Sequence, residues 1–187
     1  MGKPFIDLMC QRVSFPKLTA PAPNAEELEK VFQAALRAPD HKQLKPWRYL
    51  IIEGDARNKL GQIFRDAALQ DQTDLNETQL NKYLAMPLRA PMIIVGISTN
   101  QSHPKVPVHE QVLSCGVGIA YMLLGLQALG YGGIWRTGPL AEHSHIKTGL
   151  RIEPHETLVG FLYLGTPQGA AKNISPLNSK DYFQLWS

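Results

Sequence analysis

The sequence of 187 residues has few cysteines and little net charge. Cys10 and Cys115 are its only cysteines and cannot build a disulfide framework, so we expect a protein of the reducing cytoplasm. The formal net charge of +3 is too small to favour nucleic acid as a partner, although it suits a small anionic ligand. A hydrophobic content of 44% indicates a globular chain, and the length fits a single domain over residues 1–187.

Targeting and membrane-spanning segments are also not expected. The first ten residues lack the apolar core of a signal peptide. The longest apolar segment, 112–129, has eighteen residues, and a membrane span is the rival interpretation because a span needs about 20. Ser114, Tyr121 and Gln127 lie inside this segment. We therefore interpret it as a buried central helix and expect no membrane association.

Several catalytic motifs begin in the sequence but are not completed. Tyr121 stands where a dinucleotide-binding motif needs its third glycine, and Thr166 stands where a P-loop needs lysine. Leu113 stands where a zinc protease needs its second histidine. The sequence thus favours none of these three kinds of site, and we expect no metal.

Hydrophobic periodicity predicts a mixture of helices and strands, in an α+β or α/β arrangement. Helices are expected at residues 5–9, 25–38, 60–68, 80–84, 112–129 and 141–150, and strands at 47–52, 91–98, 134–138 and 157–165. Asn24 and Glu27 predict a capping box at the start of the second helix, and Pro39 predicts its end, which puts Arg37 in the last turn. Tyr182 and Trp186 suggest an anchor for the otherwise polar tail.

Small residues form a stripe along the expected central helix. Ser114, Gly118 and Gly125 fall on one face, because offsets of 4 and 11 residues return to nearly the same direction at about 100° per residue. Such a stripe allows a flat ligand or another helix to approach closely. The sequence leaves these two interpretations open.

Three cationic clusters stand beside turns or element ends. They are Arg12 with Ser14, Arg37 with His41, and Arg136 between Trp135 and Thr137. Arginine and serine together suit a phosphate, and a positive group beside a flavin ring stabilises its reduced form. If the clusters converge, flavin mononucleotide (FMN) fits them as a ligand with a phosphate at one end and a polar ring at the other.

The sequence resembles the nitroreductase family, and more closely its short bacterial branch of NAD(P)H nitroreductases. The resemblance extends from about Phe5 to Pro167. It is carried by the segments RAPDHKxxxPWRYLIIEG (37–54), APMIIV (90–95), KVPxxEQ (105–111), GYGGIWRTG (130–138) and VGFLYLGTP (159–167).

The resemblance implies an α+β, nitroreductase-like three-layer sandwich, with a mixed, mainly antiparallel sheet around a long central helix. It also implies an FMN-dependent homodimer with flavin at the subunit interface. The flavin-binding residues that it implies are Arg12, Val13 and Ser14 for the phosphate, Arg37 and His41 from the partner subunit, and Trp135, Arg136 and Thr137 in a later turn. Residues 125–130 match the expected nicotinamide contact. Val13 departs from the family, which often has a second basic residue there.

By this resemblance the protein passes hydride from NAD(P)H, through flavin N5, to a nitroaromatic, quinone or enone with ping-pong kinetics. We name no catalytic side chain, because the flavin performs the chemistry. One alternative is a flavin-binding redox sensor or carrier without catalysis. Another is a metal hydrolase using His41, His103 and His109, whose spacing does not suit a metal.

Overall fold

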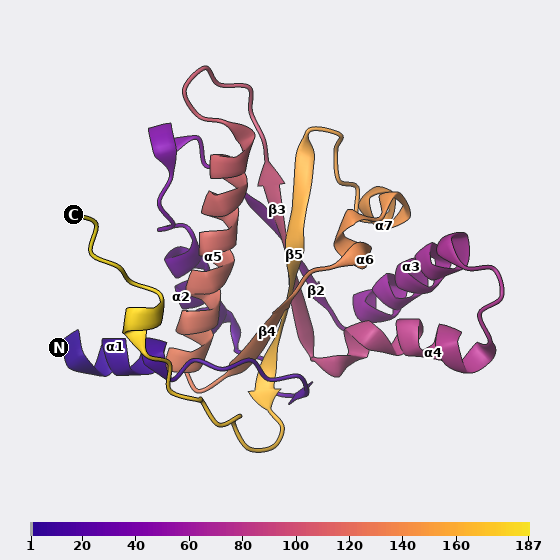
Figure 1. Cartoon of the computed structure of the whole chain (residues 1–187). Coiled ribbons are helices and arrows are strands. Elements are labelled where there is room, and N and C mark those ends of the chain that lie inside the picture. Colours follow the sequence, from indigo (N-terminus) through magenta and orange to yellow (C-terminus); the bar gives the residue numbers. More distant parts are fainter. Residues whose placement is uncertain (1) are drawn as a thin grey trace.

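The computed structural model describes residues 2–187 and shows an antiparallel sheet between two layers of helices (Figure 1). The helices are α1 (Gly2–Cys10), α2 (Ala25–Ala35), α3 (Ala56–Asp71), α4 (Glu77–Ala85), α5 (Val108–Ala128), α6 (Pro139–Glu142) and α7 (Ser144–Gly149). The strands are β1 (Leu18–Thr19), β2 (Arg48–Glu53), β3 (Met92–Thr99), β4 (Gly132–Arg136) and β5 (Glu156–Pro167). Short 3₁₀ turns are η1 (His41–Gln43), η2 (Met86–Arg89) and η3 (Ser179–Asp181).

Strand β5 is the centre of the sheet. It pairs with β1, β3 and β4, and β3 in turn pairs with β2. Every one of these pairs in the described chain is antiparallel. The predicted α+β class with a mainly antiparallel sheet is therefore confirmed, but the described strands include no parallel pair, so the sheet within this chain is not mixed.

The alternation of side chains along the strands creates one hydrophobic core on each face of the sheet. Ile93 and Val95 of β3 face α3, where Phe64 packs edge-on against Phe161 with ring centroids 5.4 Å apart. Ile94, between them in the sequence, belongs to the other core, which α2 and α5 cover. All five side chains are buried.

The small-residue stripe on α5 serves helix packing. A Cβ at Gly118 would lie 3.3 Å from the carbonyl oxygen of Ala35 in α2, and one at Gly125 would lie 3.5 Å from Val31 in the same helix. Helix α5 is long and apolar enough to cross a membrane, but it packs against α2 and three strands of the sheet. Its composition is therefore explained by its place beside the core.

The predicted capping box at the start of α2 is confirmed. The N–H of Glu27 donates to Asn24 Oδ1 at 3.0 Å, and the N–H of Asn24 donates to Glu27 Oε2 at 2.9 Å. The predicted end of this helix is wrong, because α2 stops at Ala35. Arg37 therefore lies in the turn after the helix rather than in its last turn.

The helix expected at 141–150 is interrupted at His143. Helix α6 ends at Glu142 and α7 begins at Ser144, because extended backbone at His143 breaks the run. The Nδ1 atom of His143 accepts a hydrogen bond from the N–H of His145 at 3.1 Å and so caps α7. A side-chain cap of this kind is not visible in hydrophobic periodicity.

An ion pair joins the starts of β2 and β5. The guanidinium of Arg48 donates from Nε and Nη2 to the two carboxylate oxygens of Glu156, each at 2.6 Å. The Arg48 guanidinium holds the pKa of Glu156 below its ordinary value. The fork geometry fixes the orientation of both side chains as well as their charges.

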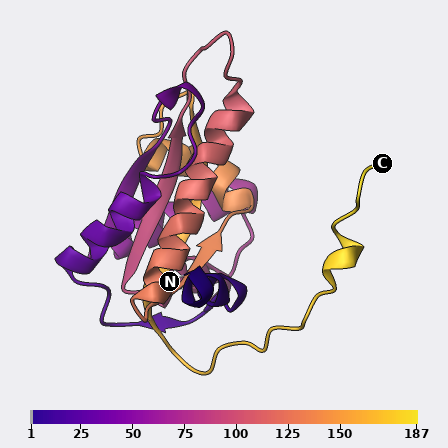
Figure 2. The ribbon, with the colours of Figure 1, turned by 90° about the vertical axis from the view of Figure 1, so that its left-hand side faces the viewer.

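The chain after β5 leaves the body of the molecule, and the expected anchoring of the tail is wrong within this chain. Figure 2 shows the tail running away from the helices, and the side chains of Tyr182 and Trp186 are 67% and 96% exposed. Nothing in the described part of the same chain covers these rings.

Candidate functional site

Three cavities lie along the outer side of α5, near several of the predicted site residues. Figure 2 shows α5 crossing the near face of the molecule, with α1 lying across its lower end. The three cavities adjoin along this side because neighbouring cavities share lining residues. The cavity beside Arg12 shares Met9 and Leu124 with the middle cavity, and the middle cavity shares Arg37 with the cavity beside Trp47. We call these three cavities together the α5 groove.

One end of the α5 groove carries Arg12, Ser14 and Trp135 around a cavity of about 450 Å³. Arg12 Nη1 lies 3.5 Å from Ser14 Oγ, so a guanidinium and a hydroxyl are close enough to contact one anion. In the described chain no carboxylate forms an ion pair with Arg12. Val13 lies between the two polar residues and is half-buried.

The local backbone explains why Arg12 and Trp135 meet. Residues 11–15 leave α1 and run beside β4, where the N–H of Phe15 donates to the carbonyl oxygen of Gly133 at 3.1 Å. Trp135, two residues further along β4, projects toward α5, and its ring would lie 3.2 Å from a Cβ at Gly116. Its indole Nε1 donates to the Val159 carbonyl oxygen at 3.3 Å, which fixes the ring.

The middle of the α5 groove is apolar. Its cavity, of about 420 Å³, is lined by Phe5 and Met9 from α1 and by Tyr121 and Leu124 from α5, with Arg37 at its margin. The side chains of Phe5 and Met9 are 56% and 43% exposed. Apolar walls beside a guanidinium suit a flat ring with a polar edge.

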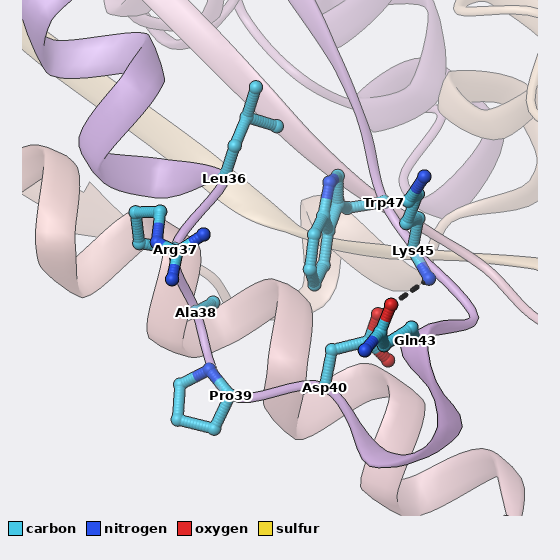
Figure 3. A pocket seen from close by; sticks show the side chains of 8 residues that line it. All are labelled: Leu36, Arg37, Ala38, Pro39, Asp40, Gln43, Lys45 and Trp47. Carbon is cyan, nitrogen blue, oxygen red and sulfur yellow. Dashed lines mark hydrogen bonds between the residues drawn. The ribbon is translucent and has the colours of Figure 1, made fainter.

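The far end of the α5 groove is the loop after α2, with a cavity of about 390 Å³. Figure 3 shows the ring of Trp47 standing between the segment that carries Arg37 and the loop that carries Asp40 and Lys45. Asp40 accepts hydrogen bonds from the backbone N–H groups of Leu44, at 3.2 Å, and Lys45, at 2.7 Å. Its carboxylate therefore holds the loop.

That loop has an unusual backbone. Lys42, Gln43 and Lys45 have φ values of 64°, 53° and 50°, in the left-handed region that favours glycine. Each non-glycine residue in this region carries a strain of about 1–2 kcal/mol. The carboxylate of Asp40 offsets part of this strain by holding the loop from inside.

His41 is paired with a residue that sequence reasoning missed. Its Nδ1 lies 2.8 Å from Oε2 of Glu110, in the first turn of α5. A carboxylate at Nδ1 leaves Nε2 as the ring nitrogen that faces away from the pair. The partners are 69 positions apart in the sequence, which explains why no local pattern revealed the contact.

The three residues of the later turn are divided between the two faces of the sheet. Trp135 faces α5, but Arg136 projects to the opposite face, where its Cζ lies 5.5 Å from the centroid of the Tyr163 ring. Thr137 follows the strand and is exposed. Only the main chain of Arg136 therefore remains near Trp135, so its side chain does not join Arg12 and Arg37.

The thiol of Cys115 in α5 is buried and unreactive. Burial raises the pKa of Cys115 to about 12, so the thiol stays protonated at neutral pH. Cys10 is exposed on α1. Among residues 2–187 no group of three or more His, Cys, Asp or Glu side chains is placed to hold a metal ion.

Comparison with known proteins connects this geometry to one family. The family model described as "Nitroreductase family" matches residues 11–166. An Escherichia coli K12 protein named "Putative NAD(P)H nitroreductase YdjA" is 36% identical over 163 residues, which cover 87% of this chain and 88% of that protein. A Haemophilus influenzae relative with the same family name is 34% identical over 95% of this chain and 96% of its own length.

Solved structures with the same fold extend the comparison. A nitroreductase-like family protein from Bacillus cereus has a TM-score of 0.82 at 19% identity, over 97% of this chain and 95% of that one. A Desulfovibrio desulfuricans protein described as a nitroreductase in complex with FMN has a TM-score of 0.74 at 18% identity, over 97% of this chain and 96% of its own. At these identities the structures show the likeness of the fold.

Proposed function

Because the chain belongs to the nitroreductase family, we propose that it is an FMN-dependent oxidoreductase that uses NAD(P)H to reduce an electron-poor acceptor such as a nitroaromatic, quinone or enone. The observation that carries this proposal is the end of the α5 groove where Arg12 and Ser14 lie beside Trp135 and adjoin the apolar middle of the groove. Each cavity has the volume of an ordinary small-molecule site, in the range of about 300–1,000 Å³.

The residues present fit the cofactor at its phosphate end. Arg12 offers a guanidinium fork and Ser14 a hydroxyl donor, at 3.5 Å from each other and without a competing carboxylate partner in the described chain. Val13 contributes no charge, so the phosphate would depend on these two side chains and on the backbone between them. This makes Arg12 the residue whose loss should weaken binding most.

The ring end would lie against apolar surface. Trp135 is fixed by its hydrogen bond to Val159 and would give one wall. The main chain of Arg136 and the exposed Thr137 follow it directly and would border the ring, while the Arg136 guanidinium is directed elsewhere. Bound FMN would supply the hydride-transfer chemistry, and a site shared by NAD(P)H and the acceptor in turn gives ping-pong kinetics.

A second copy of the chain would complete the site. The α5 groove is open along its length, and Leu113 on the same helix is 64% exposed. A homodimer formed over this side would cover the apolar surface and would bring Arg37 and His41 of each subunit to the flavin of the other. The free cysteines, one exposed and one buried, are compatible with the reducing cytoplasm as its location.

Glu110 would then act as a positioning residue for His41. Its carboxylate holds Nδ1 at 2.8 Å, so Nε2 is the nitrogen that a flavin in the partner's site would meet. No side chain near the groove needs to act as a general acid or base. The chain's own contribution is to bind, to orient and to exclude water.

The absorbance spectrum of the purified protein, followed by anaerobic titration with NAD(P)H, tests the proposed function. We expect a flavin spectrum, at once or after addition of FMN, that bleaches on titration and returns when a quinone is added. Flavin that binds but is not reduced would indicate a sensor or carrier instead. A protein that neither binds FMN nor oxidises NAD(P)H would contradict the proposal.

A further inference from the structure

A second, smaller cavity lies on the face of the sheet opposite α5. It has a volume of about 190 Å³ and is more enclosed than any part of the α5 groove. Phe64 of α3 and Phe161 of β5, both buried, form its floor, and Leu140 of α6 forms one side. Side chains alternate between the two faces along β4. Trp135 therefore lines the α5 groove, and its neighbour Arg136 lines this cavity.

Two arginines from separate parts of the chain line this cavity. Arg136 comes from the end of β4 and Arg89 from η2, 47 residues earlier in the sequence. Both guanidinium groups act on the hydroxyl of Tyr163: burial raises its pKa to about 12, and both arginines oppose that rise. The two positive charges therefore converge on one small space.

Neither charge is neutralised within the described chain. No carboxylate forms an ion pair with Arg89 or Arg136 there. Acidic residues on the elements around the cavity have other partners: Asp66 of α3 binds Arg65 at 2.7 Å, and Glu142 of α6 binds Lys147 at 3.2 Å.

The packing of Arg136 leaves part of its hydrogen-bonding capacity unused. Its guanidinium lies over the Tyr163 ring, which explains how the side chain is held. Its Nε is buried, however, and no group in the described chain accepts a hydrogen bond from it. A buried donor without an acceptor is unfavourable, and so is a pair of like charges beside an apolar floor.

We propose that this cavity is a binding site for a small carboxylate with a compact apolar body. The carboxylate would accept hydrogen bonds from the two guanidinium groups, whose planar forks match its geometry. The apolar body would rest on Phe64, Phe161 and Leu140. The volume lies below the roughly 300 Å³ at which drug-sized sites begin, so the cavity is too small to enclose a flavin or any other nucleotide.

The first experiment is calorimetric titration of the purified protein with benzoate in low-salt buffer, using benzamide as the uncharged ligand of the same shape. We expect benzoate to bind with one site per chain and benzamide to bind at least tenfold more weakly. The titration is carried out with and without saturating FMN. Absence of benzoate binding would overturn the proposal, and inorganic phosphate binding as tightly as benzoate would overturn the apolar part of it.

Two matched variants locate the site. Arg89→Gln removes one charge from an exposed residue that lines the cavity, and Arg151→Gln removes the same charge from an exposed residue outside it. We expect the first to weaken benzoate binding at least tenfold and the second to leave it unchanged. Circular dichroism and the melting temperature show that both variants are folded.

Benzoate binding in the α5 groove is the competing outcome. Arg12→Gln would then abolish binding while Arg89→Gln would preserve it, and saturating FMN would compete with benzoate. That result would contradict the second site. The proposed flavin chemistry is tested by its own spectrum, so the two proposals can fail separately.

Discussion

The two faces of the sheet are built from the same strands but are finished differently. On the α3 face, four helices and η2 close the core, and Phe64, Ile93 and Phe161 are buried. On the α5 face, the inner side of α5 is buried against the sheet, but Leu113 on its outer side and Phe5 of the neighbouring α1 are exposed. The chain's own helices therefore cover the α3 face, whereas the outer side of α5 leaves apolar side chains exposed, where we propose that the cofactor and a second copy bind.

The largest loss of stability is expected from a substitution in the core beside α3. Phe64→Ala removes a buried ring that packs edge-on against Phe161, and we expect the free energy of unfolding to fall by about 3–5 kcal/mol. Chemical denaturation measures the change. Leu69→Ala, in the same helix but 36% exposed, is the matched control and should cost about 1 kcal/mol or less. Equal losses for the two variants would show that this face is not the closed core described above.

The junction between α5 and α2 offers a sharper comparison between two glycines. Gly118→Ala would place a methyl group against Tyr49 Oη and 3.3 Å from the Ala35 carbonyl oxygen, so we expect a loss of about 1–3 kcal/mol in unfolding free energy. Gly125→Ala meets only Val31, at 3.5 Å, an ordinary contact.

The second glycine variant should be neutral or more stable, because alanine favours the helix over glycine by about 0.8–1.0 kcal/mol. Thermal melting of both variants checks the pair. If Gly125→Ala destabilised the protein as much as Gly118→Ala, the loss of stability at Gly118 could not be attributed to its local contacts. It would instead indicate close packing along the whole stripe.

The smallest change in stability is expected from Arg12→Gln. This variant tests whether FMN binding in the α5 groove can be weakened without destabilising the protein. Arg12→Gln should weaken FMN binding about tenfold, because a charge-assisted contact to the phosphate of about 1.4 kcal/mol is lost. Titration of flavin fluorescence measures the dissociation constant. The melting temperature of the flavin-free protein should stay unchanged, because Arg12 is exposed and has no ion pair in the described chain. An unaltered dissociation constant would show that Arg12 does not contact the phosphate of FMN.

Much of the fold could be predicted from the sequence because hydrophobic periodicity and capping residues act locally. The long helix and the central strands were found from their apolar runs, and the capping box at Asn24 was found from two residue types three positions apart. The break at His143 was not, because it depends on a ring nitrogen that accepts a hydrogen bond from a backbone N–H. The exposed tail also differs from its expectation, since its aromatic residues have no partner in the described chain.

The site was predictable only in part, for a related reason. Arg12, Ser14 and Trp135 line one cavity, and Arg37 of the same chain lines the adjoining one, whereas the expected contact of Arg37 with the flavin of a partner subunit stays a prediction. Arg136 was expected to join them with its charge, but strand alternation directs its side chain to the other face. Contacts between distant segments, such as His41 with Glu110, follow from the tertiary fold and leave no local pattern.

The hydrogen bond between Phe15 and Gly133 has a consequence for solubility. Strand β4 pairs with β5 on one side, so its other side is a potential template for another chain. The segment that carries Arg12 and Ser14 lies along that side and occupies one of its carbonyl groups at 3.1 Å. A chain that lacks residues 1–15 would therefore lose the proposed anion contact. It would also expose the edge of β4, which promotes aggregation.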